Sequence, residues 1–427
     1  MAGDKAIPTP LSPREVKRRI HGRDEVALLD LREAGQYGEG HPFLAVPLPY
    51  SRLELLAPKL LPRRSTPLIL LDQNDGVAER AARRLAALGY SDISKLDGGA
   101  PAWAAAGYTL FKGVNLPSKT LGELVERELH VPSLTVEQLA AMKAEHRPLL
   151  QLDGRPLEEY RRFTVPGALC CPNAELAHRL PAFGAGPETP VVVSCAGRTR
   201  SIVGAASLIA AGFSNPVYAL ENGTQGWALA GWELERGADR LYPRELSPGM
   251  LAASRARGSA MLEKYRIPTV DAATLADWRR DETRTLYLLD VRTPEEFAAG
   301  HFSGAVSAPG GQLVQATDLW VAVRNARVLL LDDTGLRAAL AARWLRAMGH
   351  EAHVFDPEAR REDWRPRDES ERDERGSALP LLEARSAPDL RREIESGAMR
   401  LLDLRPSMTA RRGMLAGARW SIRPRLV

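Results

Sequence analysis

The chain has 427 residues, of which 44% are apolar and 26% are charged, and its formal net charge at pH 7 is +4. This composition is typical of a folded globular protein and argues against a disordered chain, and the length suggests about three or four units of ordinary domain size. The small positive charge is spread over arginine-rich segments without interleaved aromatics, which argues against a nucleic-acid partner.

The N-terminal segment lacks the apolar region of a secretory signal, and no stretch approaches the roughly 18 apolar residues that cross a bilayer. We therefore expect no membrane association. The three cysteines, Cys170, Cys171 and Cys195, do not make a disulfide framework in so long a chain. A cytoplasmic, reducing location is the simplest expectation.

Four segments open in the same way, with an apolar strand that ends in Asp-x-Arg and a polar turn. Their aspartates are Asp30, Asp153, Asp290 and Asp403. In the first three copies a second apolar strand leads to Asp72, Cys195 and Asp332, each 42 residues after the aspartate of its copy. The identical offset indicates an internal repeat.

An Ala- and Leu-rich segment follows each of these strands and predicts a helix. The three helices end at glycine, a common helix stop, at Gly89, Gly212 and Gly349. A short strand, an acid and a tryptophan follow, and we expect these tryptophans to pack in the core or between domains: Trp103, Trp227 and Trp364. The order strand, helix, strand predicts parallel βαβ units with right-handed crossovers.

The copies divide the chain into expected units. These are a first repeat at 1–112, a helical linker at 113–133, a second repeat at 134–240, a helical linker at 241–267, a third repeat at 268–366, and a charged linker with a partial fourth repeat at 367–427. We expect the two helical linkers to be ordered and packed between domains. The charged stretch from Arg365 is expected to be solvated and mobile.

The fourth copy is partial, because its equivalent of Cys195 would fall beyond Val427. Half a parallel sheet cannot bury both faces alone. The fragment is therefore expected to dock on a neighbouring repeat, to pair with another chain, or to be poorly ordered, and the sequence does not choose among these.

The segment SCAGRTRS at 194–201 is the clearest candidate for a reactive site, because Cys195 ends an apolar strand there and opens a loop. A free cysteine has a pKa near about 8.5. Three features would lower it: a nest of loop N–H groups, the N-terminus of the helix that begins near Ser201, and the charges of Arg198 and Arg200. An inert buried cysteine is the alternative, and the two arginines and Gly197 argue against it.

The same loop could hold a small sulfur oxyanion beside Cys195. Ala196 and Gly197 let the backbone curl close to the sulfur, and Thr199 and Ser201 supply hydroxyl donors.

Together, the Asp-x-Arg strand, the Glu-Glu-Phe or Glu-Glu-Tyr turn, the Gly-His-x-x-Gly-Ala segment and the Cys-x-x-x-x-Arg-Ser loop resemble the rhodanese family of sulfurtransferases, over nearly the whole chain. The third repeat has the opening as DVRTPEEFAAGHFSGAV, and the second has the loop as CAGRTRS. The resemblance implies an α/β fold of tandem rhodanese-like domains, each a parallel five-stranded sheet flanked by helices.

The resemblance also implies a two-step, ping-pong reaction without metal or organic cofactor. Cys195 would take a sulfur from a small donor such as thiosulfate, become a persulfide, and pass the sulfur to a thiol or a sulfur-carrier protein. Cys195 and Arg200 are the expected catalytic residues. The expected substrate-binding residues are Arg198, Ala196, Gly197, Thr199 and Ser201.

The sequence departs from the family pattern in two ways. Asp72 and Asp332 replace the nucleophile, so we expect the first and third repeats to be inactive and either to shape the cleft over Cys195 or to recruit the acceptor. The second repeat has Thr164 where the others have His41 and His301. We interpret these histidines as structural, so their loss should not stop catalysis.

Phosphatases and arsenate reductases of this fold are expected to have a Cys-x-x-x-x-x-Arg loop, one residue longer than here, which argues against phosphatase activity. Two competing functions stay open. One is a persulfide relay fed by a cysteine desulfurase, and the other is a binding scaffold with vestigial chemistry. The oligomeric state is also open, with pairing through the partial fourth repeat as one option.

Other polar groups have plainer interpretations. Cys170 and Cys171 could supply a resolving thiol, but small packing residues are favoured. Asp153 and Arg155 are expected to pair with each other or to cap the loop that positions Cys195, rather than to touch substrate. His350 and His353 have a spacing that suits a metal, but without a third ligand a surface turn is expected. Asp72, Asn74 and Asp75 suggest a cation site, and a solvated turn is favoured there.

Overall fold

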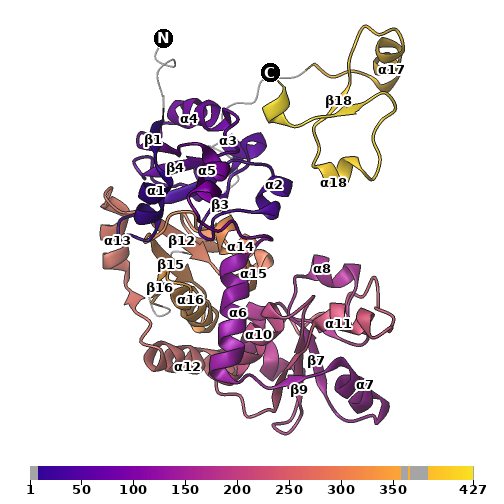
Figure 1. The fold of residues 1–427 in the computed structure, drawn as a ribbon. Helices are drawn as coiled ribbons and strands as arrows, with labels where there is room; N and C mark the ends of the chain where they lie inside the picture. Colours follow the sequence, from indigo (N-terminus) through magenta and orange to yellow (C-terminus); the bar gives the residue numbers. More distant parts are fainter. Residues whose placement is uncertain (1–7, 357–363, 366–382, 427) are drawn as a thin grey trace.

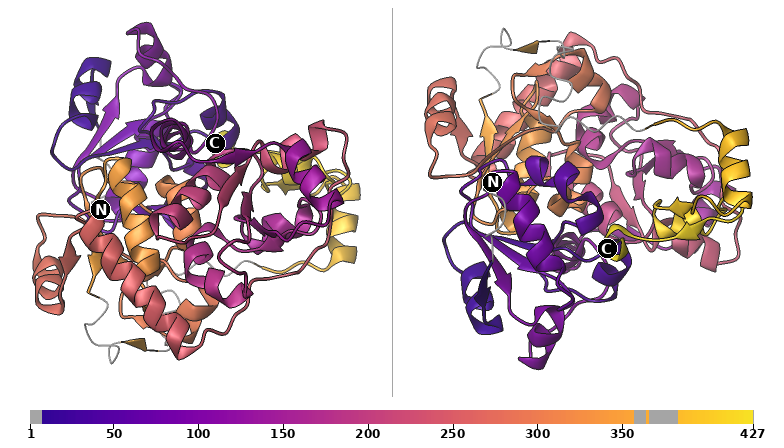
Figure 2. Two further views of the ribbon diagram at one scale, coloured as in Figure 1. Left: turned by 90° about the horizontal axis from the view of Figure 1, so that it is seen from below. Right: turned by 90° about the horizontal axis from the view of Figure 1, so that it is seen from above.

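The computed structural model describes residues 8–356, 364–365 and 383–426. Within these ranges the chain forms three five-stranded parallel sheets with helices on both faces, joined by long helices (Figures 1 and 2). The predicted α/β fold of tandem parallel-sheet repeats is confirmed. No helix in the described ranges is both long enough and apolar enough to span a membrane.

The three sheets share one strand order, in which the strand that leads to Cys195, or to its counterpart, lies in the centre. In the first repeat the order is β1 (Thr9–Leu11), β5 (Ile93–Leu96), β4 (Leu68–Leu71), β2 (Ala27–Asp30) and β3 (Val46–Pro47). In the second it is β6 (Ser133–Leu134), β10 (Val217–Leu220), β9 (Val191–Ser194), β7 (Leu150–Asp153) and β8 (Leu169–Cys170). In the third it is β11 (Thr269–Val270), β16 (Glu351–Phe355), β15 (Arg327–Leu331), β12 (Leu286–Asp290) and β14 (Val306–Ser307).

The helices recur in the same way between the strands. The first repeat has α1 (Pro13–Ile20), α2 (Ala34–Glu39), α3 (Leu53–Leu60), α4 (Val77–Ala87) and α5 (Gly99–Ala105). The second has α7 (Val136–Ala144), α8 (Leu157–Arg162), α9 (Asn173–Arg179), α10 (Thr199–Ala210) and α11 (Gly223–Leu229). The third has α13 (Ala272–Arg280), α14 (Pro294–Ala299), α15 (Gly310–Gln315) and α16 (Leu336–Ala347). A short β13 (His301–Phe302) pairs antiparallel with β17 (Trp364–Arg365).

Local sequence accounts for the central elements. Val191–Ser194 is fully buried, as expected for a central strand of a sheet covered on both faces. The glycines predicted to stop the helices follow α4, α10 and α16, and they have left-handed φ values of 90°, 77° and 87° at Gly89, Gly212 and Gly349. The predicted helix ends are therefore confirmed.

The connections between repeats are helices packed between neighbours. The first linker forms α6 (Leu116–Leu129), which lies along α10 and also contacts α15 (Figure 1). The second forms α12 (Pro248–Lys264), which packs on α16. One continuous apolar cluster draws side chains from all three repeats, so the repeats share a core.

The second and third repeats pack through equivalent helices. Helix α9 contacts α15 and α16, and the Trp344 indole N–H donates to the Ser207 hydroxyl over 2.9 Å between α16 and α10. The first repeat packs on the third, where the Tyr287 hydroxyl donates to the Leu60 carbonyl over 2.6 Å. Glu25 accepts from Arg63 and from Arg284 at 2.9 Å each.

The partial fourth repeat is described from residue 383 to residue 426. It comprises α17 (Ala387–Glu395), β18 (Leu402–Asp403), α18 (Ser407–Ala410), β19 (Arg419–Trp420) and a final 3-10 turn, η6 (Arg423–Arg425). Strands β18 and β19 form a two-stranded parallel sheet. Arg423 donates to Glu54 of α3, so the fragment docks on the first repeat. The stretch expected to be mobile after Arg365 lies outside the described residues.

Candidate active site

An Asp-Arg pair stands near the start of each repeat, and it is buried in the three full repeats. In the second repeat Arg155 donates to Asp153 over 2.7 Å, and its other contact is the Phe163 carbonyl at 2.6 Å. The same two contacts recur for Arg32, Arg292 and Arg405, each with the aspartate two residues earlier and a carbonyl eight residues later. The predicted pairing is confirmed, and Arg155 is almost fully buried. In the second repeat the pair joins the end of β7 to the segment that follows α8.

Cys195 lies directly after β9, and only 2% of the residue is exposed. Its carbonyl accepts from the Thr224 N–H over 2.8 Å, and the Ala196 carbonyl accepts from the Gln225 N–H over 3.1 Å. Gly223 makes this approach feasible. A Cβ there would lie 2.0 Å from the Cys195 carbonyl oxygen, and its φ is +48°. The N-terminus of α11 therefore fixes the base of the loop.

The loop after Cys195 leads directly into α10, which begins at Thr199. Ala196, Gly197 and Thr199 are half-buried at its rim. The Cys195 Sγ lies 3.7 Å from the Ser201 Oγ, which donates to the Arg198 carbonyl over 2.7 Å. The first turn of a helix has amides without intrahelical acceptors, so the loop sets the sulfur beside the positive end of α10.

Arg200 turns toward α8, where it forms a bidentate pair with Glu159. Both N–H···O distances are 2.9 Å, and the Arg200 side chain is 13% exposed. Burial is the largest single influence and opposes the charged form, but the hydrogen bonds that Arg200 donates to Glu159 and the attraction of nearby anions together raise the pKa of Arg200. Arg200 also interacts electrostatically with Cys195, so the structure brings these two predicted residues together.

Arg198 is held on the other side of the loop by α6. Its Nε and Nη2 donate to the Glu123 carboxylate at 3.2 Å each, and Nη2 also donates to Glu126. The side chain of Arg198 is 39% exposed. Arg198 is thus engaged by the linker helix, and its role in substrate binding remains a prediction.

Sequence reasoning missed the three glutamates. Glu159 could have been predicted from the sequence, because it belongs to the recurring Glu-Glu-Tyr turn and lies six residues after Asp153. Glu123 and Glu126 could not have been predicted as partners of Arg198, because they lie 75 and 72 residues before it, in a linker.

In the first repeat, Asp72 occupies the position of Cys195. Its carboxylate accepts from the backbone N–H groups of Asn74 at 2.9 Å and Ala78 at 3.0 Å. The interpretation as a solvated turn is wrong for Asp72, which is buried because it caps the start of α4. Asn74 and Asp75 are exposed.

In the third repeat, Asp332 is also buried and accepts from the N–H groups of Gly335 and Arg337. Burial raises the pKa of Asp332. Arg337 is fully buried and pairs with Glu296 and with Glu175 of the second repeat. This loop is part of the interface between the repeats.

Cys170 and Cys171 are fully buried free thiols. Burial raises the pKa of Cys170 to about 12 and raises that of Cys171 well above its usual range. Both thiols are therefore protonated near neutral pH, which supports a packing role.

The repeated histidines lie in the core of their repeats. His41 and His301 stack on Tyr37 and Phe297 at 3.7 and 3.9 Å between ring centroids. Thr164 fills the equivalent place in the second repeat and donates to Asp153 over 2.8 Å. These contacts support the structural interpretation.

The other polar groups differ in part from expectation. A surface turn is wrong for His353, which lies within β16 beside Trp278, because alternation along the strand turns it against that ring. Trp103 and Trp227 are buried and donate to the carbonyls of Thr109 and Glu233, in line with packing. The side chain of Trp364 lies outside the described residues.

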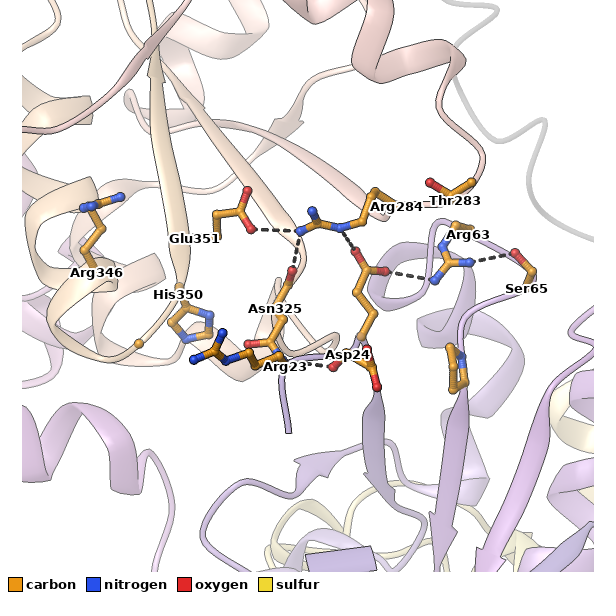
Figure 3. A pocket seen from close by; sticks show the side chains of 13 residues that line it. Arg23, Asp24, Arg63, Ser65, Thr283, Arg284, Asn325, Arg346, His350 and Glu351 are labelled. Carbon is orange, nitrogen blue, oxygen red and sulfur yellow. Dashed lines mark hydrogen bonds and ion pairs between the residues drawn. The ribbon is translucent and has the colours of Figure 1, made fainter. Parts of the chain in front are cut away.

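A hollow of about 750 Å³ lies between the first and third repeats, away from the Cys195 loop (Figure 3). Its arginines include Arg63 and Arg284, which are paired with Glu25, and Arg284 also reaches Glu351 at 2.8 Å. His350 lines this hollow, and burial lowers its pKa to about 4. The ion pair between Glu25 and Arg284 joins the first repeat to the third across this hollow.

The geometry defines an α/β protein of tandem parallel-sheet repeats with one cysteine-centred loop. The rhodanese-like domain model matches three times, at residues 12–106, 135–230 and 271–358. These matches cover more than half of the chain, which therefore belongs to the rhodanese family.

The structure is similar to a thiosulfate sulfurtransferase from Pseudomonas aeruginosa, with a TM-score of 0.87 and 41% sequence identity over 98% of this chain and 79% of that one. Curated relatives include the tRNA uridine(34) hydroxylases of Xylella fastidiosa strain M23, 38% identical over 104 residues, and of Xanthomonas euvesicatoria pv. vesicatoria, 38% identical over 95 residues. Those matches cover 22% and 20% of this chain and only 39% and 37% of the relatives, about one repeat.

Proposed function

We propose that this protein is a sulfurtransferase that moves a sulfane sulfur through a persulfide on Cys195. The observation that carries the proposal is the placement of this one sulfur. Cys195 directly follows a central strand, lies at the N-terminus of α10, and interacts electrostatically with the half-buried Arg200. Family membership and the likeness to a thiosulfate sulfurtransferase at 41% identity support the same chemistry.

The first half-reaction is a displacement at sulfur. With thiosulfate, the Cys195 thiolate attacks the outer sulfur, the S–S bond of the donor breaks, and its electron pair leaves with sulfite. The enzyme then carries a Cys–S–S⁻ persulfide, and charge is conserved. Positive charge from Arg200 and the α10 N-terminus would stabilise this anion.

In the second half-reaction an acceptor thiolate or cyanide attacks the outer persulfide sulfur, and the Cys195 thiolate leaves. A thiol or a sulfur-carrier protein in the cytoplasm is the proposed acceptor. No step needs a metal or an organic cofactor. The short loop, with Arg200 five residues after Cys195, suits a single sulfur better than a phosphoryl group.

Intact-protein mass spectrometry tests the proposal. After incubation with thiosulfate, the wild type should gain one sulfur, and cyanide should remove it. The Cys195→Ser variant should gain none, while a Cys170→Ser variant should still gain one. A wild-type protein that gains no sulfur from thiosulfate or from an organic persulfide would overturn the proposal.

A further inference from the structure

Helix α6 packs beside the Cys195 loop and binds one of the loop arginines. It lies between the first two family matches, outside any repeat, and runs along α10 (Figure 1). The contact is close because of Gly122, where a Cβ would stand 3.0 Å from the Thr199 Cγ2 and 3.2 Å from the Thr199 Cα. Leu121 and Val125 anchor the helix in the core.

Polar side chains of α6 bind the guanidinium of Arg198 and hold it against this helix. Glu123 and Glu126 are one turn apart and both bind its guanidinium. Glu221, at the end of β10, also acts on Arg198 electrostatically. Glu159 accepts from two of the three guanidinium nitrogens of Arg200, Nη1 and Nη2. The two loop arginines thus face four carboxylates, so the formal charge of this group of six side chains is negative.

A negative balance matters because thiosulfate is a dianion and Cys195 must be a thiolate to attack it. Fields of this kind change association rates by about tenfold or more and depend on ionic strength. We infer that Glu123 and Glu126 are positioning residues that set donor specificity, so that the site favours an organic persulfide without net negative charge over an anionic donor. This inference rests on the proposed function.

The reaction with such a donor balances in the same way. The Cys195 thiolate attacks the outer sulfur of R–S–S–H, and the donor S–S bond breaks. The electron pair leaves with R–S⁻, and the proton stays with the new Cys–S–S–H. No oxidant or reductant is consumed.

The test uses two organic persulfides whose terminal groups have opposite charge, 2-aminoethyl hydropersulfide and 2-sulfonatoethyl hydropersulfide, with thiosulfate as a third donor. In the wild type, kcat/KM should be about tenfold higher for the aminoethyl donor, and kcat/KM for thiosulfate should rise with ionic strength. In Glu123→Gln/Glu126→Gln, kcat/KM for both anionic donors should rise about tenfold, and the rise with salt should vanish.

Two controls separate charge from structure. Glu128→Gln removes an exposed carboxylate of the same helix, one that pairs with Arg127 and not with Arg198. The donor preference of this variant should stay as in the wild type. Glu126→Asp keeps the charge and should also keep the preference. If the double glutamine variant forms the persulfide with an unchanged donor ratio, the inference is wrong and the proposed function stands. If no donor loads Cys195 in the wild type, the proposed function itself fails.

Discussion

Arg200 in the second repeat and Arg337 in the third occupy one position, five residues after Cys195 and Asp332 respectively. Each is bound by the glutamate six residues after the Asp-x-Arg aspartate of its repeat, Glu159 or Glu296. The third repeat therefore keeps the arginine–glutamate pair of the second repeat but has aspartate in place of the cysteine.

Because the two repeats share this arginine–glutamate pair, replacing Asp332 by cysteine tests whether a thiol alone is enough for persulfide formation in the third repeat. We predict that Asp332→Cys gains no persulfide, because Arg337 is fully buried and is held by Glu175 and Asp333 at the repeat interface. A donor would have to open that interface. Mass spectrometry after donor treatment should find one added sulfur per chain in this variant, as in the wild type. Two added sulfurs would refute the prediction.

Arg200 should be needed in its planar, bidentate form. Replacing it by lysine keeps the charge but loses one of two 2.9 Å contacts to Glu159, so the cation would be less well fixed beside the sulfur. We expect kcat/KM for sulfur transfer to fall about tenfold in Arg200→Lys and about a hundredfold in Arg200→Ala. Arg162→Lys, at an exposed pair on α8, should have wild-type kinetics.

How much of this site the sequence predicts depends on chain separation. The Asp153–Arg155 pair was predictable because its members are two residues apart and the pattern recurs in all four copies. The partners of Arg198 were not, because a linker of no repeating pattern supplies them. The choice of central strands followed from apolar runs such as 191–193, whereas β8 and β14 have two residues each and carry no periodic signal.

The repeated Asp-Arg pairs predict a graded effect on stability. Arg155→Met leaves Asp153 charged and buried without its partner, which should lower the free energy of unfolding by about 3–5 kcal/mol. In the fourth copy Arg405 is 50% exposed, so Arg405→Met should have a much smaller effect. Urea unfolding of both variants checks this, and equal midpoints would count against a supporting role for the buried pair.

Docking of the fourth copy should depend on pH through Glu54. Hydrogen bonds from Arg423, and secondarily from Arg84, lower the pKa of Glu54 from 4.5 to about 2 against the opposing effect of burial. The depressed pKa means that this contact is fully stabilising above about pH 4.5 and weakens as the pH falls toward 2. Hydrogen exchange at residues 383–426 should accelerate over that window before the rest of the chain responds.

The matched variant for this pH effect is Glu54→Gln. It should show fast exchange in the same segment already at pH 7 and little further change on acidification. An acid-induced acceleration of equal size in this variant would mean that another group controls docking.

Gly223 and Gly212 separate the steric demand of the loop from backbone strain. Both have a left-handed φ, +48° and +77°, so alanine strains the backbone at either site. Only at Gly223 would the new Cβ meet the Cys195 carbonyl, at 2.0 Å, whereas nothing lies within 4 Å at Gly212. We expect Gly212→Ala to lose about 1 kcal/mol of stability and to keep its activity. Gly223→Ala should displace the loop from α11 and lose most sulfur transfer at a temperature where the protein remains folded. Equal activity in the two variants would show that contact between α11 and the loop does not position the sulfur.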